Sequence, residues 1–99
     1  MSTRRPPGKR TAEQKARSWV VERVQTGVRM EKRILKVLKA LAELHDMSLG
    51  DLLEGIVLHA FEGKAPFDEP SRRKIADLKR VYGLDLDASA SHRLEERPS

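Results

Sequence analysis

The sequence contains no cysteine and few aromatic residues, with one Trp, one Tyr and two Phe among 99 residues. The lack of cysteine excludes disulfide bonds, thiol nucleophiles and cysteine-ligated zinc, and it fits a reducing compartment. A chain of this length buries only about 60 to 65% of its unfolded surface. We therefore expect one small domain with a thin core, no enclosed catalytic cleft and no enzymatic activity.

Long apolar runs are also missing, since no stretch approaches the ~20 residues that cross a bilayer. Residues 1–7 do not have the pattern of a secretory leader. The histidines lack metal-ligand spacing, and the glycines form no phosphate-binding loop. The sequence predicts a cytoplasmic protein with no membrane partner, metal or cofactor.

Charge is present in separate blocks. The net charge is +5, and residues 1–19 carry six basic side chains against Glu13. Residues 23–39 are mainly basic, whereas residues 43–70 carry seven acidic side chains against Lys64 alone. A basic arm followed by a basic segment is typical of proteins that bind a polyanion. From charge alone, a solvated tail that aids solubility is an equal alternative.

The pattern of residues 23–30 has period two, which predicts a strand. One face carries Val24, Thr26, Val28 and Met30, and the other carries Arg23, Gln25, Gly27 and Arg29. The sequence offers no second convincing strand. Because the backbone of a single strand needs hydrogen-bond partners, we expect the same strand of a second copy to pair with it antiparallel.

Helical periodicity begins at Glu31 and predicts an amphipathic helix over residues 31–45. Ser48 is expected to cap a second helix that ends at Gly63 and is apolar over most of its circumference. Pro70 opens a third helix, expected over about residues 70–82 and closed by Gly83. The remainder, residues 84–99, reads as a poorly ordered polar tail.

These patterns divide the chain into a flexible basic arm (residues 1–19), a strand-helix-helix domain (20–63) and a C-terminal extension (64–99). The second helix is too apolar for the first helix to cover, so we expect two subunits to share one core. The residues expected in this core of a homodimer are Val24, Val28, Met30, Leu38, Leu41, Leu52, Leu53, Ile56 and Val57.

This order of elements resembles the ribbon-helix-helix superfamily of DNA-binding proteins over residues 23–63. The resemblance is carried by Val28-Arg29-Met30 leading into Glu31, by Ile34, Leu35, Leu38, Leu41 and Ala42 in the first helix, and by Met47-Ser48-Leu49 opening the second. It implies a mainly α protein with one N-terminal strand that is paired across a homodimer and followed by two core helices.

The resemblance also implies roles for individual residues. Paired strands in that family enter the major groove, so Gln25, Gly27 and Arg29 would face base edges and Arg23 the phosphates. Gly27 departs from the pattern, because it has no side chain that reads a base. The turn at Ser48, Leu49 and Gly50 would bind a phosphate through free backbone N–H groups, or serve only as an ordinary cap. In the arm, Arg4, Arg5, Lys9 and Arg10 would contact phosphates.

The resemblance implies a homodimer that binds double-stranded DNA in a sequence-specific way. Such a protein would be a transcriptional repressor associated with the nucleoid. Two alternatives remain open from the sequence. One is the antitoxin of a toxin pair, in which residues 67–86 bind the toxin as a protein partner. The other is a helical protein-interaction module with no nucleic-acid role, for which the basic arm only aids solubility. Separately, Arg29 and Gln25 could form only the solvent-exposed face of the strand instead of reading bases.

Overall fold

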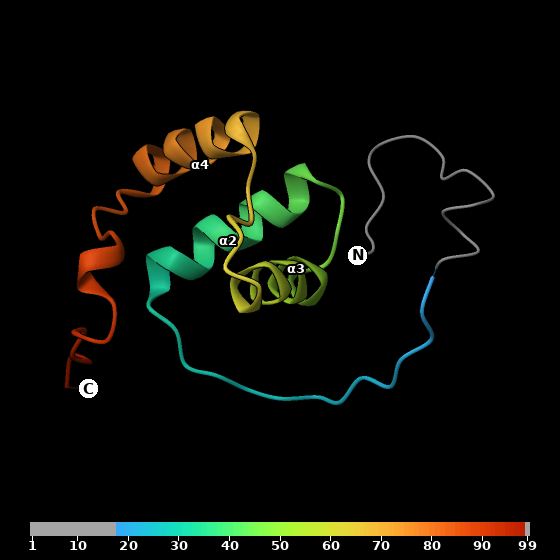
Figure 1. Ribbon diagram of the computed structural model, residues 1–99. Helices are drawn as coiled ribbons and strands as arrows, with labels where there is room; N and C mark the ends of the chain where they lie inside the picture. Colours follow the sequence, from blue (N-terminus) through green and yellow to red (C-terminus); the bar gives the residue numbers. More distant parts are fainter. Residues whose placement is uncertain (1–17, 99) are drawn as a thin grey trace.

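The computed structural model describes residues 18–98, which form a helical fold (Figure 1). Its elements are α2 (Lys32–Leu44), α3 (Leu49–Phe61), α4 (Glu69–Tyr82) and a short 3-10 helix, η1 (Ala88–Ala90). The mainly α architecture predicted from the sequence is therefore confirmed. The predicted phosphate contacts of the arm, Arg4, Arg5, Lys9 and Arg10, lie outside the described residues.

Side-chain caps set the starts of α2 and α3. The Glu31 carboxylate accepts a hydrogen bond from the backbone N–H of Ile34 at 2.9 Å, and Ser48 Oγ accepts one from the N–H of Asp51 at 3.1 Å. Both bonds satisfy backbone donors that a helix leaves free in its first turn. Between the helices, Asp46 adopts a φ of 57°, which its short polar side chain tolerates. The predicted helix over residues 31–45 is thus confirmed to within one residue.

The third helix also follows its predicted limits. Asp68 caps it through the N–H of Ser71 at 2.9 Å, and Pro70 lies in its first turn. Gly83 closes it with a φ of 66°, a backbone conformation that glycine adopts without steric cost.

The core lies between α2, α3 and α4. Leu41 is only 1% exposed, and Ala42 and Leu52 are buried beside it. The partly buried side chains packed around them are Leu38, Met47, Ile56, Phe67, Ile75 and Leu78. The last three belong to the C-terminal extension, so this extension shares the core of residues 32–61.

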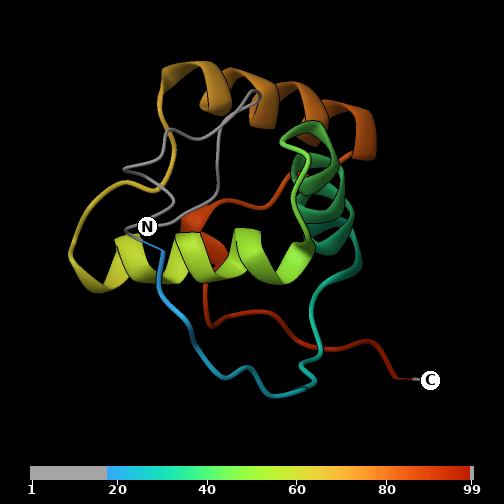
Figure 2. The ribbon, with the colours of Figure 1, turned by 90° about the vertical axis from the view of Figure 1, so that its right-hand side faces the viewer.

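Figures 1 and 2 show the same order of elements from top to bottom. The α4 helix lies above α2 and α3, and residues 18–31 run below α3, on the side away from α4. The Lys36 ammonium lies 5.9 Å from the centre of the Tyr82 ring, which adds a cation–π contact between α2 and α4.

The predicted strand does not form within this single chain. Residues 18–31 are neither helix nor strand, and residues 18–98 contain no strand at all. The physical reason is the one that applies to every lone strand, because a ladder needs a second backbone. Val24 and Val28, which were expected in a core, are 79% and 73% exposed here.

Within residues 84–98, the tail contains a short 3-10 helix, η1, and otherwise has no regular secondary structure apart from a turn. Asp87 caps η1 by accepting a hydrogen bond from the N–H of Ser89 at 3.0 Å, and the pKa of Asp87 is lowered by its hydrogen bonds with Ser89. Beyond η1 the chain returns to the start of the fold, where Glu96 contacts Arg29. The polar side chains of residues 84–98 thus include a helix cap, Asp87, and an ion-pair partner of Arg29, Glu96.

Candidate nucleic-acid interface

Arg23 fastens residues 18–31 to α3. Its guanidinium forms a two-point contact with the Glu54 carboxylate, with Nε to Oε2 at 2.9 Å and Nη2 to Oε1 at 2.8 Å. The hydrogen bond raises the pKa of Arg23 and lowers that of Glu54. Both side chains remain largely in solvent, so salt screens this contact. The residue expected to face phosphates is thus paired with a carboxylate of α3.

Arg29, the expected base-reading arginine, is also paired. Its Nε donates to Glu96 Oε1 at 3.2 Å, and its Nη2 contacts Glu96 Oε2. The side chain of Arg29 is 82% exposed, which leaves it accessible from solvent. The planar fork of the guanidinium is the group that binds guanine O6 and N7 in a major groove.

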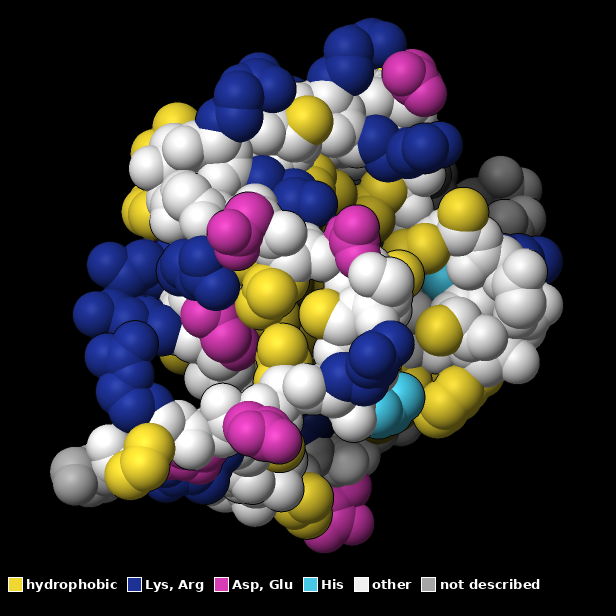
Figure 3. All heavy atoms as spheres, turned by 90° about the vertical axis from the view of Figure 1, so that its left-hand side faces the viewer, with side chains coloured by type: hydrophobic (Ala, Val, Ile, Leu, Met, Phe, Trp, Pro, Cys, Tyr) yellow, Lys and Arg dark blue, Asp and Glu magenta, His cyan; other side chains and the backbone are white. Residues whose placement is uncertain are grey.

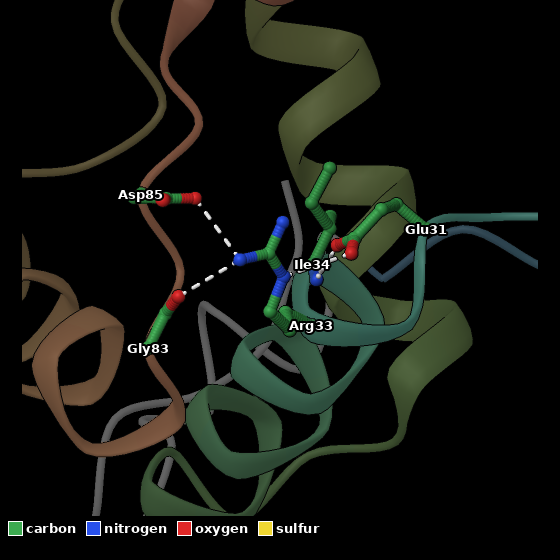
Figure 4. Close-up of polar contacts among 5 residues, drawn as sticks. All are labelled: Glu31, Arg33, Ile34, Gly83 and Asp85. Atoms are coloured by element: carbon green, nitrogen blue, oxygen red, sulfur yellow. Dashed lines mark hydrogen bonds and ion pairs between the residues drawn. The ribbon is translucent and has the colours of Figure 1, made fainter. Parts of the chain in front are cut away.

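Arg33 joins the start of α2 to the end of α4 (Figure 4). Its Nε donates to Glu31 Oε2 at 2.9 Å, and its Nη1 donates to the Gly83 carbonyl and to Asp85 Oδ1, both at 3.0 Å. The hydrogen bond to Glu31 raises the pKa of Arg33, while the N–H of Ile34 and then Arg33 lower the pKa of Glu31. Arg33 therefore fixes where the tail leaves α4.

Gln25 and Gly27 complete the expected outward face, and both are exposed. A Cβ added at Gly27 would meet no atom within 4 Å, so no neighbour among residues 18–98 requires glycine there. Among the four residues of this face, Arg23 and Arg29 contact acidic side chains of the fold.

The turn at Ser48, Leu49 and Gly50 has the geometry of an ordinary cap. Ser48 Oγ accepts from Asp51 N–H, and the Ser48 carbonyl accepts from Leu52 N–H at 3.0 Å. Gly50 is exposed, and a Cβ there would meet nothing within 4 Å. The Asp51 carboxylate lies in the same first turn, where it also benefits from the positive end of the helix.

The residues expected in a dimer core fall into two groups. Leu38, Leu41, Leu52 and Ile56 pack within the chain's own core. The other group is exposed and consists of Val24, Val28, Met30 and Val57. Leu58 and Phe61, which were not expected in the dimer core, are exposed as well. Leu53 lies between these extremes. Phe61 is 81% exposed, so α3 presents an uncovered apolar side.

Basic side chains gather on a further surface, along the upper edge of the face in Figure 3, which α4 forms. This helix carries Arg72, Arg73, Lys74, Lys79 and Arg80. Two of them are paired along the helix, Arg73 with Glu69 at 3.4 Å and Arg80 with Asp77. The helix nevertheless keeps an excess of positive charge.

The sequence alone missed the contacts that connect distant parts of the chain. Arg33 was only one basic residue on the wet face of a helix, and Asp85 and Glu96 were parts of a tail. Phe67 lies in a polar stretch between the second and third predicted helices, and its apolar ring is the signal that it packs inward.

The described residues were also compared with the features of metal sites and membrane spans, and the chain was compared with known proteins. Residues 18–98 hold no group of three or more His, Cys, Asp or Glu side chains that could bind a metal ion. Within the same range, no helix combines the length and apolar character that a membrane crossing requires. Comparisons with protein-family models, with curated proteins and with solved structures found no match.

Proposed function

We propose that this protein binds double-stranded DNA as a homodimer, through a ribbon formed by residues 23–30 of two subunits, and acts as a transcriptional regulator. The proposal rests on the sequence and the exposure of residues 23–30. This segment alternates apolar and polar residues, leaves Val24 and Val28 exposed, and leads directly into α2. A second copy of the same segment would satisfy its backbone and cover both valines.

The apolar side of α3 supports the homodimer. Val57, Leu58 and Phe61 are exposed on a helix whose opposite side is packed in the core. Exposed apolar clusters of this kind are unfavourable in a monomer and mark interaction sites. Residues 18–31 run beside the same helix, so one symmetric interface would bury both features.

Charge supports DNA as the ligand. Arg23 and Arg29 lie on the polar face of the segment, and α2 adds Lys32, Lys36 and Lys39. In the proposed complex Arg29 and Gln25 read base edges, because Arg pairs with guanine and Gln with adenine. Arg23 and the basic arm contact phosphates, which hold the protein on any sequence.

The packing of the extension favours a regulator over an antitoxin. A toxin-binding extension is expected to keep its apolar residues free for the partner. Here Phe67, Ile75 and Leu78 already pack against the core. Residues 67–86 thus contribute to the fold of the protein itself.

Titration of a mixed-sequence DNA duplex, followed by fluorescence anisotropy at several salt concentrations, tests the proposal. We expect binding that weakens steeply as salt rises, since each neutralised phosphate contributes a slope of about 0.9. Deleting residues 2–10 removes four basic side chains, so affinity should fall on all sequences alike and the slope should flatten. Absence of binding at low salt would instead favour the protein-interaction module.

Arg29 separates sequence reading from simple charge attraction. On a sequence selected for tight binding, Arg29→Ala should cost about 1 to 3 kcal/mol per contact, and Arg29→Lys should not restore it. Arg73→Ala removes the same charge from α4 and serves as the control. Equal losses for the Arg29 and Arg73 variants on selected and scrambled duplexes would remove residues 23–30 from the proposed interface.

A further inference from the structure

The C-terminal tail contacts the segment that carries the proposed base-reading arginine. Arg29 and Glu96 are 67 positions apart in the sequence, and two atoms of each side chain take part in their contact. Arg29 Nε lies 3.2 Å from Glu96 Oε1, and the second pair joins Nη2 to Oε2. The carboxylate therefore occupies the edge of the guanidinium that Nε and Nη2 form.

A second contact fixes the start of the same tail. Arg33 binds both the Gly83 carbonyl and the Asp85 carboxylate, where the chain leaves α4 (Figure 4). Asp85 and Glu96 thus approach two arginines that are four positions apart in the sequence, Arg29 before α2 and Arg33 in its first turn. Both ends of the tail, at Asp85 and at Glu96, are thus held beside these two arginines.

The contact at Arg29 blocks one edge of the guanidinium to the proposed ligand. Guanine O6 and N7, or two phosphate oxygens, can bind the same Nε and Nη2 donors that Glu96 occupies. This edge cannot hold two bidentate partners at once, and the Glu96 carboxylate also repels any phosphate nearby. DNA that binds Arg29 through this edge must therefore displace Glu96.

We infer that residues 84–98 are an intramolecular competitor of DNA, with Glu96 occupying the donors of Arg29 in the free protein. This inference rests on the proposed function, since it needs Arg29 to contact DNA. The tail is released when DNA binds, and its carboxylate lowers the affinity for every sequence that Arg29 contacts.

The expected effect is modest, because both side chains are mostly in solvent. Exposed ion pairs are weak, and their typical strength corresponds to a factor between about 1.5 and 5 in an equilibrium constant. The tail should therefore weaken binding by no more than about fivefold per subunit at low salt, and by less as salt screens the pair.

Two neighbouring glutamates provide a matched experiment. Glu96→Gln removes the competitor, whereas Glu95→Gln makes the same change of charge at a residue for which residues 18–98 supply no ion-pair partner. Both full-length variants are titrated with the mixed-sequence duplex at one low salt concentration. We expect Glu96→Gln to bind about 1.5- to 5-fold more tightly than Glu95→Gln, and the advantage to vanish when Arg29→Ala is added to both.

The possible outcomes separate a failure of this inference from a failure of the proposed DNA binding. If the wild-type protein binds no DNA at low salt, the proposed function is wrong and the competitor has no ligand. If the wild type binds and the two glutamine variants have equal affinities, the function stands and the inference is overturned. A gain from Glu96→Gln that persists in the Arg29→Ala background would also overturn it, because the tail would then act elsewhere.

Discussion

Apolar side chains are buried in one region of the molecule and exposed in another. The first region is the interface between α2 and α4, and the second is the surface formed by residues 18–31 and the outer side of α3. Between α2 and α4, residues such as Leu41 and Ile75 pack against one another. Along the other surface, Val24, Val28 and Phe61 face solvent. One chain therefore buries the first region by itself, whereas the second leaves apolar side chains in solvent, where we propose that a second copy packs.

The largest effect is expected where that missing partner would lie. Val28→Lys places a charge in the proposed ribbon interface twice, once per subunit. An unpaired buried charge costs about 3 to 5 kcal/mol, so the dimer dissociation constant should rise at least ~100-fold. Sedimentation should then show a monomer whose thermal midpoint no longer depends on protein concentration.

Gln25→Lys is the matched control for this change, because it adds the same charge to the opposite face of the segment. It should sediment as the wild-type dimer does. If the Val28 and Gln25 variants are both dimers, the apolar face of residues 23–30 is not part of a subunit interface.

The next effect concerns the region that one chain completes. Leu41→Ala removes the most deeply buried side chain and should lower the free energy of unfolding by about 2 to 5 kcal/mol. Leu44→Ala makes the same change on the same helix at an exposed position and should stay within about 0.5 kcal/mol of wild type. Urea unfolding followed by circular dichroism measures both. Similar losses for the two variants would contradict the placement of the core.

A smaller effect is expected at the turn between α2 and α3. Ser48→Ala removes the oxygen that caps α3 and should cost about 1 kcal/mol of stability. Ser48→Asn keeps an acceptor of equal rank and should be nearly neutral. The same urea experiment applies, and an alanine variant as stable as the asparagine variant would mean that the cap contributes nothing.

The smallest effect is a dependence on pH at the junction of the two regions. The pKa of Glu31 is lowered in the fold by the N–H of Ile34 and by Arg33. Its contribution to stability is therefore complete above the ordinary glutamate pKa of about 4.3, and it is lost as pH falls through the lowered value. The stability difference between wild type and Glu31→Gln should shrink over that acidic window. A difference that stays constant from neutral to acidic pH would exclude this role for the Glu31 carboxylate.

Local signals predicted the helices well, because each boundary depends on residues near it. Ser48 and Gly83 are visible as cap and stop before any tertiary contact is known. The spacing of Ile75 and Leu78 likewise indicates one apolar face on α4. Such spacing does not indicate which helix that face packs against.

The proposed site was less accessible to sequence analysis. The spacing of Gln25, Gly27 and Arg29 predicts a polar face, but pairing of this segment requires a backbone from outside one chain. The contact between Arg29 and Glu96 leaves no periodic trace, because the two residues are distant in sequence and joined only by the path of the tail.

The anchoring of Asp85 by Arg33 affects how often the weak ion pair between Arg29 and Glu96 forms. A free carboxylate would have to be abundant to occupy Arg29, but a carboxylate on a short tether from a fixed point is present at an effective concentration of about a millimolar or more. Occupancy then depends on the length of the tether rather than on the amount of protein. In the proposed mechanism, a competitor of constant local concentration divides the affinity by the same factor for every sequence that Arg29 contacts. The ranking of those sequences would be preserved, while the weakest of them would fall below the level at which they are occupied.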